Sequence, residues 1–125
     1  MKLKFIKSIN ESNILVSLTL TGMTANEKKA IRYLGAPIIS LEKTYEVSGT
    51  SVLMEQAVND FVSVETSFEG TVDNISEIME EANTFINDVK DAVETEMIEL
   101  MNTYKEIEKE LEKQSGEFEI KDGEN

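Results

Sequence analysis

Hydrophobic and polar side chains alternate along residues 13–21, and this alternation predicts a β-strand with one buried face. The hydrophobic positions of the segment are Ile14, Val16, Leu18 and Leu20. A period of two, together with several β-branched side chains, is typical of a half-buried strand. Residues 2–7 predict a shorter strand, and residues 10–13 are rich in the side chains that favour a turn between the two.

A short helix is predicted next, because signals for both of its ends are present. Thr24 and Glu27 have the spacing of a capping box, in which each side chain bonds to the other residue's backbone N–H. Gly35 is placed to end the helix, and Pro37 prevents its continuation. The side chains that we expect to face the core are Ala30, Ile31 and Leu34.

Three further segments, 38–46, 51–58 and 61–68, have the alternation of strands. The pattern of 51–58 also permits a helix, but the turn-like Asn59-Asp60 favours a hairpin with 61–68. These segments lead us to expect an α+β fold with an antiparallel sheet of four to five strands.

From about residue 72 to residue 113 the pattern predicts one long amphipathic helix. Hydrophobic side chains recur from Ile75 to Leu111 at a mean spacing of about 3.6 residues, the period of a straight α-helix. Acidic residues gather at its start and lysines at its end, as the helix dipole favours. We therefore predict a single domain over residues 1–113, with the sheet and short helix in 1–70, the long helix in 71–113, and an acidic tail in 114–125.

The length of this helix is the main functional clue in the sequence. Forty residues of helix span about 60 Å, whereas a domain of this size has a radius of gyration of about 14 Å. We expect the helix to cover the sheet through about Val93. The second half carries a hydrophobic stripe that needs another partner: Met97, Leu100, Met101, Tyr104, Ile107 and Leu111.

Four arrangements would cover this stripe. It packs within its own chain, pairs with a second copy, binds a groove of another protein, or folds back on itself at a break near residues 91–96. No Gly or Pro occurs near 91–96 to support a break. We therefore favour a homo-oligomer built on residues 94–113, which replacement of Leu100 and Ile107 by Glu should dissociate.

Charge narrows the choice of partners. The chain has a net charge of −13, but residues 1–47 carry +3 and residues 71–113 carry −9. Such acidity opposes nucleic acid and anionic membranes. A basic cluster with two aromatic residues instead favours nucleic-acid binding, as in some single-strand binding proteins. Its members are Lys2, Lys4, Lys7, Lys28, Lys29, Arg32, Phe5 and Tyr33. We expect these lysines to be ordinary surface residues and do not predict nucleic-acid binding.

Common catalytic chemistry is missing from the composition. The chain has no His and no Cys, which excludes histidine bases, thiol nucleophiles and most zinc sites. No glycine-rich phosphate-binding motif occurs. Clustered carboxylates remain as candidates for a metal site or an acid/base pair, but we expect a solvated helix face: Glu77, Glu80, Glu81, Glu94, Glu96 and Glu99. We predict no catalytic, cofactor or metal site.

The sequence thus indicates a non-enzymatic interaction or assembly protein that associates with itself through its C-terminal helix. One alternative is an acidic inhibitor that mimics DNA and blocks a basic surface of a host protein. A carboxylate and metal-dependent enzyme is the third class. Lysines interrupt the N-terminal apolar run too early for a signal peptide, and no membrane span is evident, so we expect a cytoplasmic protein. Richness in Lys, Glu, Ile and Asn is typical of small phage or mobile-element proteins of bacteria.

Overall fold

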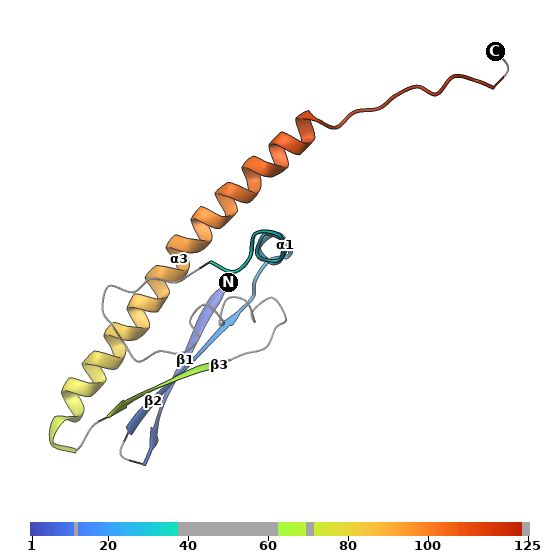
Figure 1. The fold of residues 1–125 in the computed structure, drawn as a ribbon. Coiled ribbons are helices and arrows are strands. Elements are labelled where there is room, and N and C mark those ends of the chain that lie inside the picture. Colours follow the sequence, from blue (N-terminus) through green and yellow to red (C-terminus); the bar gives the residue numbers. More distant parts are fainter. Residues whose placement is uncertain (12, 38–62, 70–71, 124–125) are drawn as a thin grey trace.

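The computed structural model describes residues 1–11, 13–37, 63–69 and 72–123. In chain order its elements are β1 (Lys2–Asn10), β2 (Asn13–Thr21), α1 (Ala25–Leu34), β3 (Ser63–Glu69), the 3₁₀ turn η1 (Val72–Asn74) and α3 (Ile75–Lys113). Figure 1 shows α3 lying along the sheet and extending well past it, with α1 beside its middle. The predicted α+β class, with an antiparallel sheet, one short helix and one long C-terminal helix, is confirmed for the described residues.

The sheet in the described part of the chain has the strand order β1-β2-β3, and both neighbouring pairs are antiparallel. Asn10 pairs with Asn13, so only two residues join β1 to β2, where the sequence predicted a turn. The expected four to five strands are not supported, since the described residues form three. The strands predicted at 38–46 and 51–58 lie outside the described residues, as does the predicted turn at Asn59-Asp60.

The core lies between β2, β3 and the sheet-facing side of α3. The four hydrophobic residues of β2 predicted to share a face are all buried, and the residues between them are only half-buried. Phe68 on β3 meets Phe85 on α3 with ring centroids 5.6 Å apart and a tilt of 56°, a favourable aromatic geometry. The buried residues of α3 are Ile78, Ala82, Phe85, Ile86, Val89, Val93, Met97 and Leu100.

Helix α1 begins and ends as the sequence predicted. The Glu27 N–H donates to Thr24 Oγ1 over 3.1 Å, and the Thr24 N–H donates to Glu27 Oε1 over 2.9 Å. At the other end Gly35 adopts φ 89°, a conformation that costs glycine little, and its N–H donates to the Ile31 carbonyl over 2.7 Å. Ala30 and Ile31 are buried as expected, but the prediction for Leu34 is wrong, since this side chain is 37% exposed.

The capping box gives a first testable prediction. Thr24→Ala removes the side-chain acceptor for the Glu27 N–H and is expected to lower the free energy of unfolding by about 1 kcal/mol. Thr24→Ser keeps the hydroxyl and should stay within a few tenths of the parent value. Urea unfolding followed by circular dichroism would measure both variants. Equal losses in the two variants would show that the methyl group of Thr24, rather than its cap, contributes the stability.

Helix α3 runs without interruption through 39 residues, so the predicted alternative of a break near 91–96 is wrong. The helix is about 58 Å long at 1.5 Å per residue. Its burial continues to Leu100, beyond the Val93 limit that we expected. The reason is α1, which packs against α3 and covers turns that the sheet does not reach.

A candidate interaction surface on the C-terminal helix

The six residues of the predicted stripe fall into two groups. Met97 and Leu100 are buried at 4% and 9% exposure and belong to the protein's own core. The other four form what we call the distal stripe: Met101, Tyr104, Ile107 and Leu111. Met101 and Tyr104 are half-buried against the core, Ile107 is also half-buried, and Leu111 is 58% exposed. Among the residues that the structure describes, only the last turns of the predicted surface therefore stay open to a partner.

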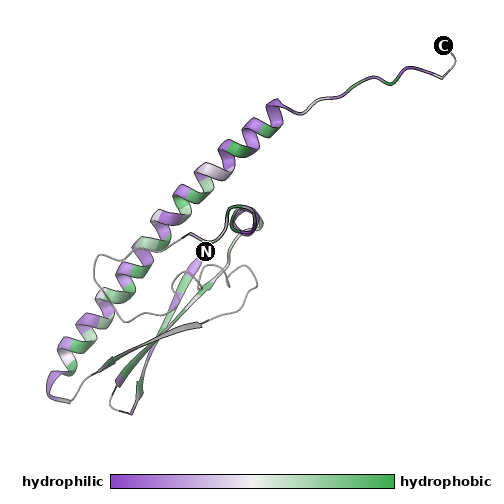
Figure 2. Ribbon diagram, in the orientation of Figure 1, coloured by the Kyte–Doolittle hydropathy of each residue, from purple (hydrophilic) through white to green (hydrophobic). Residues whose placement is uncertain are grey.

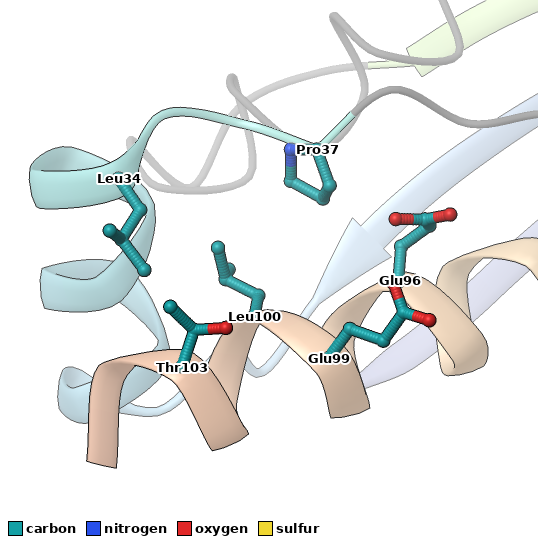
Figure 3. Close-up of a pocket in the computed structure, with 6 residues that line it drawn as sticks. All are labelled: Leu34, Pro37, Glu96, Glu99, Leu100 and Thr103. Carbon is teal, nitrogen blue, oxygen red and sulfur yellow. The ribbon is translucent and has the colours of Figure 1, made fainter. Parts of the chain in front are cut away.

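Helix α1 sets the boundary between the two groups. Figure 3 shows Leu34 and Pro37 on one side of a hollow, with Leu100 and Thr103 of α3 on the other. The hollow has a volume of about 240 Å³ and is also lined by Glu96 and Glu99. Small-molecule sites are generally larger and more enclosed. We therefore interpret this hollow as the open end of the α1–α3 contact.

The position of Leu100 corrects one expectation. The sequence predicts that Leu100→Glu together with Ile107→Glu dissociates an assembly without unfolding the sheet. Because Leu100 is 9% exposed and belongs to the core cluster, a buried carboxylate there would destabilise the protomer itself. Ile107 and Leu111 are the positions that test association without this complication.

Carboxylates border the distal stripe on both sides. With 3.6 residues per turn, Glu108 lies beside the line from Tyr104 to Leu111 on one flank, and Glu110 lies beside it on the other. Lys105, Lys109 and Lys113 recur at intervals of four and lie on the opposite side of the helix. The distal stripe is therefore a line of hydrophobic side chains with an acidic rim. Figure 2 shows hydrophobic bands continuing along α3 beyond α1.

A second exposed hydrophobic surface lies on β1, and the sequence analysis missed it. Phe5 and Ile9 pair with Leu18 and Ile14 of β2, so they lie on the core side of the sheet. Nevertheless Phe5 is 52% and Ile9 79% exposed, because α3 packs mainly over β2 and β3. Together with Lys7, which lies between them on the same face, they form what we call the β1 ledge. The alternation of Leu3, Phe5, Lys7 and Ile9 was the available signal.

The basic cluster considered for nucleic acid does not form one surface. By the alternation of a strand, Lys2 and Lys4 lie on the opposite face of β1 from Lys7. The Lys7 ammonium donates to Asn83 Oδ1 on α3 and is half-buried. The remaining basic residues, Lys28, Lys29 and Arg32, are on α1. The arrangement does not combine these groups into a groove for a phosphate backbone.

The clustered carboxylates of α3 are mostly exposed, with only Glu96 half-buried. Glu94 lies 3.7 Å from Lys90 in an exposed i,i+4 pair, which stabilises a helix by about 0.3–0.5 kcal/mol. Within the described ranges, no three Asp or Glu residues come close enough to hold a metal ion. These residues thus have the geometry of a solvated helix face.

Comparison of the chain with protein-family models, with curated proteins and with solved structures found no match. Across the part of the chain that the structure describes, no helix combines the length and the apolar character needed to cross a membrane.

Proposed function

We propose that this chain is a non-enzymatic assembly protein that associates with a second copy of itself through the distal stripe. The observation that carries the proposal is the 58% exposure of Leu111, with the half-buried Ile107 beside it, on turns of α3 that lie beyond the cover of α1. Isolated hydrophobic residues on a surface are common and need no explanation. A continuous line of them at the end of a projecting helix is typical of helix-mediated recognition.

A partner that covers the last turns of α3 lowers the free energy of those turns. A helix that projects into water gains little from propensity alone, and most helical stability in proteins comes from packing of a hydrophobic face. Burial of a Leu or Ile side chain contributes about 1.5–3 kcal/mol. A partner that covers the distal stripe therefore stabilises both itself and the end of α3. The small size of the stripe leads us to expect association in the micromolar range, about −8 kcal/mol.

Solution mass tests this function directly. Light scattering coupled to size exclusion at loading concentrations of roughly 5–500 μM, spanning this range, should give a mass that increases with concentration from the 14.1 kDa of one chain. A mass of one chain at every concentration would contradict self-association.

The acidic rim also favours a second candidate function, an inhibitor that covers a basic surface of another protein. Glu108 and Glu110 on the flanks of the stripe would then stand in for phosphates. In this case a basic nucleic-acid-binding protein would be retained by the immobilised chain and released by duplex DNA. Concentration-dependent self-association without such a competed partner favours assembly.

A further inference from the structure

We propose that the distal stripe of one copy docks against the β1 ledge of a second copy, in a head-to-tail contact. The inference rests on the proposed self-association and adds the surface that receives the stripe. Both surfaces are hydrophobic and at least partly open on the same chain. On α3 they comprise Leu111, which is exposed, with Tyr104 and Ile107, which are half-buried, and on β1 they comprise Phe5 and Ile9, which are exposed. The simpler arrangement, in which two stripes pair with each other, conflicts with the structure in either orientation.

Parallel pairing of two stripes is blocked by α1. The distal stripe continues the face of α3 that carries Met97 and Leu100, and α1 packs against that face. A parallel partner helix would have to run through the volume that α1 occupies, in both copies. The free turns, about residues 104–113, are too short for the two helices to diverge around it.

Antiparallel pairing of two stripes brings carboxylates together. If only the free turns overlap, Ile107 of one helix faces Leu111 of the other. Glu108 then lies beside Glu108 of the second copy, and Glu110 beside its Glu110. Like charges at these flanking positions disfavour pairing. The rim therefore favours a receiving surface that is hydrophobic and basic.

The β1 ledge is hydrophobic and carries one cation. Phe5 and Ile9 flank Lys7, which also donates to Asn83 of its own chain, and the first 47 residues carry a net charge of +3 against −9 for residues 71–113. The two hydrophobic lines also have similar lengths. The four residue steps of strand from Phe5 to Ile9 span about 13 Å, and the seven residue steps of helix from Tyr104 to Leu111 span about 10 Å. In this contact the acidic rim faces Lys7 of another copy, in the part of the chain that carries a net positive charge.

Neutralising the acidic rim should weaken a contact between stripe and ledge and strengthen a contact between two stripes, so the direction of the change in the dissociation constant distinguishes them. Glu108→Gln with Glu110→Gln should raise the dissociation constant about three- to tenfold if the stripe meets the basic ledge. Added NaCl should raise it further in the parent protein. Glu106→Gln with Glu112→Gln removes the same charge farther from the stripe and is the matched control. Tighter association of the Glu108/Glu110 variant, with strengthening by salt, would overturn the head-to-tail contact in favour of paired stripes while leaving self-association intact.

Cross-linking locates the contact, since the chain has no native cysteine. Ile9→Cys and Leu111→Cys are prepared as separate proteins. Each variant alone and an equimolar mixture of the two are then oxidised with Cu(II)-phenanthroline. The head-to-tail contact predicts a disulfide-linked dimer in the mixture at several times the yield of either variant alone. The pair Phe5→Cys and Ile107→Cys should behave in the same way, and Ile98→Cys in place of Leu111→Cys is the control.

Efficient dimers of Leu111→Cys alone would overturn the inference, and a parent protein that is monomeric throughout would overturn the proposed function as well.

Discussion

Replacement of Ile107 and Leu111 together by Glu is expected to convert the protein to a monomer at every concentration at which the parent associates. The two carboxylates interrupt the only part of the hydrophobic α3 face that lies beyond the cover of α1 in the described structure. Removing two carboxylates from water into a hydrophobic contact has a large unfavourable desolvation free energy. We expect the dissociation constant to rise by at least about a hundredfold, or 2.7 kcal/mol. Light scattering and sedimentation velocity would measure the change.

The helix offers a matched control for this variant. Ile98 is 63% exposed on the same helix but lies on the opposite side from the stripe. Ile98→Glu should therefore associate like the parent. The far-ultraviolet circular dichroism of all three proteins should agree, because none of the three positions is buried in the protomer. If Ile98→Glu dissociates the protein as strongly as the double variant, net charge rather than the stripe controls association.

The largest effect on stability is expected at Phe85. Its side chain is fully buried and contacts the ring of Phe68, so it connects the N-terminal third of α3 to β3. Phe85→Ala leaves a cavity as well as losing hydrophobic burial, and should lower the free energy of unfolding by about 3–5 kcal/mol. Phe118 is 95% exposed in the C-terminal tail. Phe118→Ala removes the same atoms and should change stability by less than about 0.5 kcal/mol.

Both substitutions are best measured in the monomeric Ile107→Glu, Leu111→Glu background, since association would otherwise add to the apparent stability. Urea unfolding monitored by circular dichroism gives the free energies. A loss at Phe85 below about 1 kcal/mol would show that α3 does not pack on the sheet as described. A large loss at Phe118 would show that the tail packs against the body in solution.

Local signals in the sequence predicted the best-defined parts of the fold. The alternation of 13–21 identified β2 and its buried face, and Thr24, Glu27 and Gly35 identified both ends of α1. The 3.6-residue period predicted the long helix. These features are encoded by neighbours within a few residues of one another, so they are accessible without knowledge of the tertiary structure.

The extent of the candidate surface was harder to predict from the sequence, because it depends on contacts between segments that are distant in the chain. By length alone, only the sheet covers the helix, and the predicted open stripe therefore includes Met97 and Leu100, which the structure buries. The position of α1 against α3 moves that boundary by about two turns. The exposure of Phe5 and Ile9 likewise follows from where α3 crosses the sheet, which the pattern of β1 does not contain.

The continuity of α3 has a consequence for any assembly that it builds. From Leu100 to Lys113 the helix forms a stiff arm of about 20 Å. This arm would fix the spacing and the orientation between the protomers that it connects. Seven residues inserted after Leu100 would lengthen the arm by about 10 Å. The hydrophobic side chains would return to nearly the same rotational position about the helix axis. Two inserted residues would instead swing them about 200° away, toward solvent. In any assembly built on α3, the rotational position of these side chains about the helix axis would therefore set the geometry together with their chemistry.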